Sequence, residues 1–169
     1  RSLCKKTVFG SKEDPPNFDV FLGLAKRCEY VFTSAREMIP RYICECGHPR
    51  VAELSFCINP DVQNPVGCLG RETSRGVVFS GSWMMKYPER CQELVQLFDG
   101  ALDSGAALSI FNRNSYRPDE VRYRYPQKYA PFVFPAVAHE ELGALHKSFD
   151  WSINVNSVTG SATMICTGS

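Results

Sequence analysis

The chain has 169 residues and carries 19 lysines and arginines against 18 aspartates and glutamates, so its formal net charge is +1. This balance argues against a nucleic acid as the main partner, because proteins that bind that polyanion carry a marked basic excess. Hydrophobic residues make up 44% and charged residues 22%, which is typical of a globular protein rather than a disordered or fibrous one. No apolar run approaches the roughly 20 residues that span a bilayer, and no segment resembles a signal peptide.

The eight cysteines form no recognisable zinc or disulfide pattern. None of them stands in a C-x-x-C pair, whereas four-ligand zinc sites usually draw on two close pairs. The tightest cluster, Cys44, Cys46 and His48, has no fourth ligand beside it. Free cysteines on buried faces, in a reducing cytosol, are the favoured interpretation. We therefore expect no metal, no cofactor and a cytoplasmic location, and leave peripheral membrane contact of the full-length protein open.

The first third of the chain alternates helical and extended patterns. Apolar residues recur at helical spacing over 18–25, with Asn17 as the expected N-cap. The β-branched and aromatic run 29–33 predicts a buried strand. Ser34 is expected to cap a second helix, and the alternation over 50–56 predicts another strand.

Residues 59–75 are polar and rich in proline, asparagine and glycine, without any periodicity. Loops of this length are uncommon inside compact domains, so the stretch is interpreted as a linker. It would divide the chain into one domain at 1–58 and another at 76–169. A long surface loop within a single domain is the alternative.

A strand–helix–strand pattern follows this linker. Residues 76–79 predict a continuous apolar strand and 80–87 a loop. Pro88 suits the first position of a helix that Gly105 ends, and 107–111 predict the next strand. Together they indicate a βαβ unit, whose crossover is right-handed in nearly all proteins.

The pattern repeats with a strand at 132–134, a helix at 140–149 and a strand at 151–155. Helices alternating with nearly continuous apolar strands are typical of a parallel sheet that is covered on both faces. We therefore predict an α/β fold built on one or more doubly wound, Rossmann-like parallel sheets.

In such a sheet, ligands bind beyond the carboxyl ends of the strands. Gly81 lies in the first of these loops, where a positive φ would let the backbone approach a ligand closely. The loop leads into a helix N-terminus, which favours an anion such as a diphosphate, and Lys86 adds positive charge there. Because the motif is neither G-x-G-x-x-G nor a Walker A sequence, an ordinary βα turn is the alternative.

Three further features carry polar groups that could act on a ligand. Arg113 follows a predicted strand and can pair with a phosphate or a sugar carboxylate. The loop 156–163 is rich in small hydroxyl residues, which suit either phosphate oxygens or a plain helix N-cap. Asp14, which two prolines follow, is a candidate for a catalytic general base. A Ser-His-Asp triad finds no support, because the G-x-S-x-G elbow is absent.

Several segments resemble bacterial glycosyltransferases with the two-Rossmann GT-B fold, and more narrowly the CgeB/YkvP-type, spore-protein-like branch. Their order along the chain is the strongest part of the resemblance, which runs from about residue 12 to 164. The matching segments are 12–15, 18–21, 31–35, 56–60, 64–67, 77–83, 86–91 and 150–156.

The resemblance implies a hexosyltransferase that moves a sugar from a nucleotide-diphosphate donor to a hydroxyl acceptor, such as a glycan, in cell-surface polysaccharide or glycoconjugate assembly. Residues 1–58 would end the N-terminal, acceptor-side Rossmann domain, and 76–169 would begin the C-terminal, donor-binding domain. Since the family pattern continues beyond Ser169, the chain is expected to be a fragment that can be inactive by itself. The alternative is a non-catalytic nucleotide-binding or protein-interaction module that keeps the Rossmann-like fold.

The resemblance also implies a donor site without a metal. The loop after the strand at 76–79 would lie against the diphosphate, and a second helix start near Ser161 would contact phosphate as well. The expected donor-binding residues are Gly81, Ser82, Trp83, Lys86, Arg113, Ser161 and Thr163.

Overall fold

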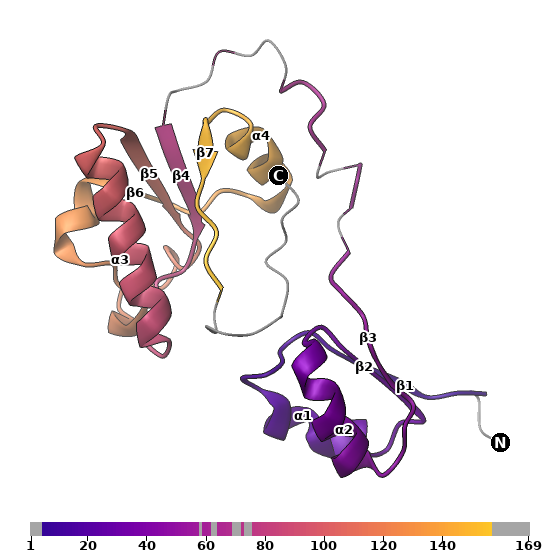
Figure 1. The fold of residues 1–169 in the computed structure, drawn as a ribbon. Helices are drawn as coiled ribbons and strands as arrows, with labels where there is room; N and C mark the ends of the chain where they lie inside the picture. Colours follow the sequence, from indigo (N-terminus) through magenta and orange to yellow (C-terminus); the bar gives the residue numbers. More distant parts are fainter. Residues whose placement is uncertain (1–4, 58, 62–63, 69–71, 73–75, 157–169) are drawn as a thin grey trace. The chain divides into compact units, whose positions relative to one another are not determined.

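The computed structural model of the chain describes residues 5–57, 59–61, 64–68, 72 and 76–156. These residues fall into two compact units, which we name unit 1 (5–57) and unit 2 (59–156) (Figure 1). Each unit holds a sheet of parallel strands with helical connections, so the chain is mixed α/β, as the sequence predicts. Within the described residues, none of the helices has the length and apolar character needed to cross a membrane.

Unit 1 is built on a three-stranded parallel sheet in the order β1-β2-β3. Its first strand is not among those that the sequence pattern predicts. The elements are β1 (Val8–Ser11), α1 (Phe18–Ala25), β2 (Tyr30–Thr33), a 3₁₀ turn (Arg36–Met38), α2 (Ile39–Cys46) and β3 (Val51–Glu53).

Of the two capping predictions in unit 1, the position of Asn17 as the N-cap of α1 is confirmed and the cap at Ser34 is wrong. Asn17 does precede α1, but its side chain makes no cap hydrogen bond and its Nδ2 donates instead to Glu13 Oε2 at 3.0 Å. Ser34 does not adjoin a helix, because a 3₁₀ turn intervenes and α2 begins only at Ile39. Tertiary packing rather than capping stabilises these short helices, because Phe18 of α1 and Tyr42 of α2 are buried and their ring centroids lie 4.7 Å apart.

Unit 2 is built on a four-stranded parallel sheet in the order β6-β5-β4-β7. Its core gathers the apolar side chains of β4, β5 and the long helix α3. The elements are β4 (Gly76–Gly81), α3 (Pro88–Asp103), β5 (Ala107–Asn112), 3₁₀ turns (Val121–Tyr123 and Gln127–Phe132), β6 (Val133–Phe134), α4 (His139–His146) and β7 (Trp151–Ser152).

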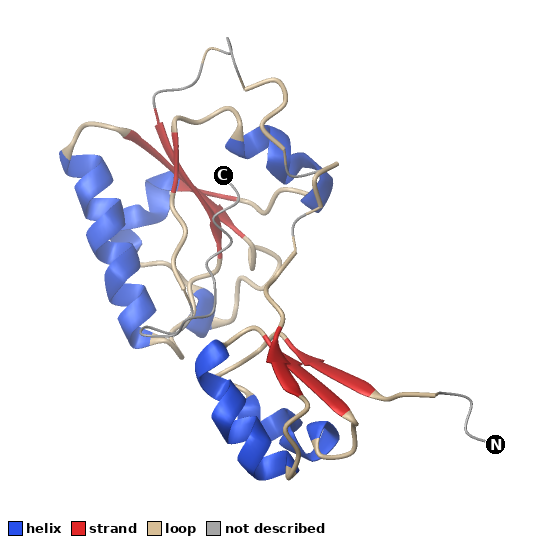
Figure 2. Ribbon diagram, turned by 45° about the vertical axis from the view of Figure 1, so that its right-hand side comes forward, coloured by secondary structure: helices blue, strands red, loops and turns tan. Residues whose placement is uncertain are grey.

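The chain reverses its direction of winding at β4. It runs outward from β4 to β5 and β6, and then returns to place β7 on the free side of β4. Because crossovers between parallel strands are right-handed, this reversal requires the connecting helices to lie on opposite faces of the sheet. Figure 2 shows α3 and α4 on opposite sides of the strands. This arrangement is compatible with a Rossmann-like fold, in which ligands bind at such a reversal.

Helix α3 follows the sequence prediction closely. Pro88 occupies its first position, and Gly105 lies beyond its end with φ +77°, a backbone conformation that glycine adopts without strain. Cys91, Leu94 and Phe98 share one face of the helix and are buried in the core of unit 2. The predicted apolar stripe is thus confirmed.

Several element ends differ from the prediction, most of all that of β3, which ends at Glu53 rather than at residue 56. β4 continues through Gly81, so the first two residues of the expected loop 80–87 belong to the strand. α4 ends at His146, because Ser148 and Phe149 form tighter bonds to the carbonyls three residues earlier. β7 ends at Ser152, although the N–H of the next residue, Ile153, still donates a hydrogen bond of 2.8 Å to the Val78 carbonyl of β4.

The core contact of α3 gives a first prediction. Phe98→Ala should lower the free energy of unfolding of unit 2 by about 3–5 kcal/mol, because Phe98 is fully buried and the substitution leaves a cavity. The exposed neighbour Leu97 provides the matched control, and Leu97→Ala should cost less than about 1 kcal/mol. Urea unfolding followed by tryptophan fluorescence reports on unit 2, which holds both tryptophans of the chain, Trp83 and Trp151. Equal losses for the two variants would contradict the packing described.

Candidate functional site

The carboxyl end of β4 is fixed by the carbonyl of Gly81, where three segments meet. The backbone N–H of Arg113 donates to this oxygen at 2.9 Å, and the hydroxyl of Tyr125 donates to it at 3.0 Å. The ring of Tyr125 also packs on Trp83, with ring centroids 5.6 Å apart. The loop after β4 and the loop after β5 are therefore held together at one edge of the sheet.

Gly81 is needed here for a different reason than the sequence suggests. Its backbone is an extended strand and does not belong to the positive-φ glycines of the described residues. A Cβ at this position would lie 2.5 Å from the ring of Phe79, whose side chain is itself buried. The expected left-handed turn at Gly81 is wrong, and packing against Phe79 is what excludes a side chain.

The next two expected donor residues have different surroundings. Trp83 is buried in the core of unit 2, so its ring supports the loop from below rather than presenting a face to a ligand. Ser82 is half-buried, and its carbonyl accepts a hydrogen bond of 2.7 Å from Nη1 of Arg90. The loop backbone is thus tied to the first turn of α3.

Arg90 places a buried positive charge under this loop. Its side chain is 8% exposed, and its Nε has no hydrogen-bond partner. No ion pair involves Arg90 among the residues that the structure describes. Burial lowers the pKa of Arg90, although a guanidinium stays charged under ordinary conditions. A buried charge without a carboxylate partner is costly, and a nearby anion would offset that cost.

The N-terminus of α3 adds to the same positive field. Tyr87 precedes the helix without any side-chain cap, and Pro88 occupies the first helical position. Free N–H groups and the helix dipole favour an anion at such an end. Lys86 is exposed beside it, with Nζ 4.6 Å from the centroid of the Tyr87 ring. The structure therefore brings Lys86 and Arg90 to the loop that the sequence singles out.

The remaining expected donor residues are placed only in part. Arg113 is exposed, and its backbone rather than its side chain makes the contact with Gly81. Ser161 and Thr163 lie outside the described residues.

His146 links the two strands that flank the point of reversal, which sequence reasoning missed. Its Nδ1 lies 2.9 Å from Ser152 Oγ, and its Nε2 lies 3.1 Å from Ser80 Oγ. Ser152 is paired in register with Val78, two residues before Ser80, so both hydroxyls face the same side of the sheet. The one available signal was the place of this histidine at the end of the crossover helix.

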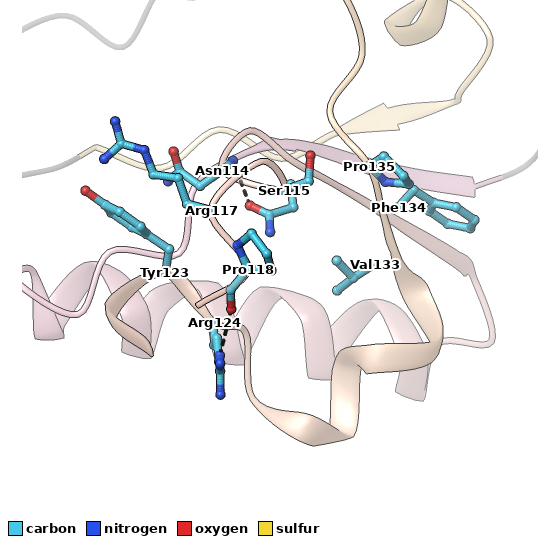
Figure 3. Close-up of a pocket in the computed structure, with 10 residues that line it drawn as sticks. Asn114, Ser115, Arg117, Pro118, Tyr123, Arg124, Val133, Phe134 and Pro135 are labelled. Carbon is cyan, nitrogen blue, oxygen red and sulfur yellow. Dashed lines mark hydrogen bonds between the residues drawn. The ribbon is translucent and has the colours of Figure 1, made fainter. Parts of the chain in front are cut away.

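The same edge of unit 2 is hollowed beyond β5 and β6. A cavity of about 270 Å³ opens there between the loop after β5 and the end of β6 (Figure 3). Its lining residues are Asn112, Asn114, Ser115, Arg117, Pro118, Tyr123, Arg124, Val133, Phe134 and Pro135.

Asp14 has structural contacts within unit 1. Its side chain is 4% exposed, and its two carboxylate oxygens accept hydrogen bonds from Thr33 Oγ1 at 2.6 Å and from the Tyr42 hydroxyl at 3.1 Å. Burial raises the pKa of Tyr42 to about 12, so its phenol stays protonated and donates. These contacts join the loop after β1 to β2 and α2, so they give Asp14 a structural role in unit 1.

The described residues contain no group of three histidine, cysteine, aspartate or glutamate side chains that could hold a metal ion. Comparison with protein-family models, with curated proteins and with solved structures finds no match.

The contacts of Asp14 predict a loss of stability when they are removed. Asp14→Ala should destabilise unit 1 by about 1.5–3 kcal/mol for each charge-assisted hydrogen bond lost. Asp19→Ala is the matched control, because the Asp19 side chain is 79% exposed and pairs only across the surface with Arg41; it should cost less than about 1 kcal/mol. Thermal unfolding followed by amide NMR signals of unit 1 measures both. A stability loss no larger than that of the control would contradict the structural role.

The surroundings of His146 predict a pH dependence. Burial lowers its pKa from the ordinary value near 6.5, so the folded protein disfavours the imidazolium. The neutral imidazole of His146 therefore contributes fully to the free energy of unfolding above about pH 6.5. This contribution is lost as the pH falls through the lower pKa of the folded state. NMR titration of the imidazole should show that lowered pKa. His146→Gln should remove this component from the pH dependence of unfolding, whereas an unchanged profile in the variant would refute it.

Proposed function

We propose that unit 2 binds the diphosphate of a nucleotide-sugar donor, and that the chain is part of a glycosyltransferase built from two Rossmann-like domains. The observation that carries this proposal is the buried Arg90, which has no carboxylate partner in the described structure. It lies in the first turn of α3, whose N-terminus has no side-chain cap and follows β4, the strand at which the winding reverses. A diphosphate is the anion that such a site accommodates in nucleotide-binding sheets.

The chemistry that this site could perform is electrostatic. In transfer of a sugar from a nucleoside diphosphate, negative charge grows on the leaving diphosphate. N–H groups and cations that are already in place stabilise that charge without reorganisation. Lys86 is exposed and can contact a phosphate directly, whereas Arg90 acts from beneath as a positioning residue through the carbonyl of Ser82.

The acceptor side is assigned by the resemblance together with the architecture of unit 1. A second parallel sheet with helical connections, β1-β2-β3, supports the pair of Rossmann-like domains that the GT-B architecture requires. Unit 1 would belong to the acceptor-side domain, and a glycan hydroxyl of the cell surface would receive the sugar. Binding of the nucleotide without transfer would instead favour a non-catalytic nucleotide-binding module.

Calorimetric titration with UDP, GDP and CDP and their sugars tests the donor site. At least one of these nucleotides should bind, and Lys86→Gln should weaken that binding by about threefold to tenfold through loss of one phosphate contact. Lys12→Gln is the matched control, because Lys12 is an exposed lysine of unit 1; it should leave the affinity unchanged. Failure of all three nucleotides to bind, or equal effects of the two substitutions, would overturn the assignment.

A further inference from the structure

The cavity beyond β5 and β6 has a polar side and an apolar side. Figure 3 shows Arg117 and Tyr123 on one side of it and Phe134 and Pro135 on the other, with Ser115 between them. A ligand that matches this division carries a polar, hydrogen-bonding end and a flat face of low polarity.

The polar side is held in shape before any ligand arrives. Asn112 Oδ1 accepts a hydrogen bond of 2.9 Å from the N–H of Asn114, and the Asn112 carbonyl accepts one of 3.0 Å from the N–H of Ser115. The N–H of Arg117 donates to the Asn114 carbonyl at 2.9 Å, and Ser115 Oγ accepts from the N–H of Ala136 at 2.9 Å. These bonds tie the loop after β5 to the segment after β6. Because the two segments are already ordered, ligand binding would cost little conformational entropy in the protein.

The charges at the cavity favour an oxyanion. Arg117 lies 3.2 Å from Glu120, and the same carboxylate also pairs with Arg122, so one acid serves two arginines. Arg124 donates its Nε to the carbonyl of Pro118 at 3.1 Å, and no ion pair involves it in the described part of the chain. This bond fixes the plane of the guanidinium and leaves its two terminal nitrogens as donors. Such a fork matches the two oxygens of a carboxylate or phosphate.

The apolar side suits one ring. Phe134 is 44% exposed and is stacked on Phe111, with ring centroids 5.5 Å apart, so its orientation is set from behind. Val133 and Pro135 flank it along the chain. The volume of about 270 Å³ lies just under the range of sites for drug-sized ligands, which indicates a ligand of one ring rather than several.

We propose that this cavity binds a single pyranose-sized ring that carries a phosphate or a carboxylate, with the oxyanion at Arg124 and the less polar ring face against Phe134. Lys86 and Arg90 of the proposed donor site do not line this cavity, and the inference holds whether or not the chain transfers sugar. A phosphate and a carboxylate both present paired, negatively charged oxygens, which is the feature that the guanidinium of Arg124 would bind.

Calorimetry on the whole chain tests this with three compounds that differ only at carbon 6. Glucose 6-phosphate and glucuronate are the two oxyanion probes, and glucose is the neutral counterpart. At least one of the oxyanion probes should bind, and glucose should bind about tenfold more weakly or not at all, because it lacks the charge-assisted hydrogen bonds. Arg124→Gln should weaken binding of the oxyanion probe by about tenfold or more, whereas Arg27→Gln, an exposed arginine of unit 1, should leave it unchanged.

Two further measurements keep the test decisive. The Phe134 ring takes no part in the hydrogen bonds of the loop after β5, so Phe134→Ala should weaken binding of glucose 6-phosphate or glucuronate while sparing inorganic phosphate. In an NMR titration of the unmodified chain, the side-chain amide signals of Asn112 and Asn114 should shift with the probe. The proposal is overturned if neither oxyanion probe binds, if glucose binds as well as they do, or if inorganic phosphate alone binds as tightly as the ring compounds.

Discussion

The position of β4 between two parallel neighbours is the constraint on which unit 2 depends. Strand β5 pairs with it on one side and β7 on the other, so the crossover helices must cover opposite faces. At the end of this strand, the carbonyl of Gly81 accepts hydrogen bonds from the Arg113 N–H and the Tyr125 hydroxyl. One backbone oxygen therefore joins the loops after β4 and β5, while the neighbouring carbonyl of Ser82 ties the first of these loops to Arg90.

The two units place buried groups of opposite charge near the carboxyl ends of their strands. In unit 1 the buried charged group there is the carboxylate of Asp14, which takes hydrogen bonds from Thr33 and Tyr42, whereas the buried hydroxyls of Ser11 and Ser34 have no partner in the described structure. In unit 2 the charged groups are cationic and incompletely satisfied, as the unpartnered Nε of Arg90 shows. A carboxylate with two hydrogen bonds inside the protein stabilises a fold, whereas a buried cation without an ion pair favours an external anion. This difference in charge is the physical reason for placing anion binding in unit 2.

Periodicity predicted the long elements of the fold because local sequence determines them. Helix α3 shows its apolar stripe and its terminal proline and glycine directly, and β4 is a continuous apolar run. The sequence pattern did not predict β1, because its four residues, Val-Phe-Gly-Ser, include only two apolar side chains. The site was less predictable, since its contacts are non-local: His146 meets Ser80 across 66 positions of sequence. Arg113 was chosen for its nearness to a strand end, yet the turns after it bring later arginines to the cavity.

The account rests on the loop after β4 being the place where an anion binds. Amide NMR of the isotope-labelled chain, titrated with a nucleoside diphosphate that binds in calorimetry, tests this most directly. The largest shifts should fall on residues 82–91, with the amides of unit 1 unmoved. Shifts confined to unit 1, or spread evenly over the chain, would contradict it.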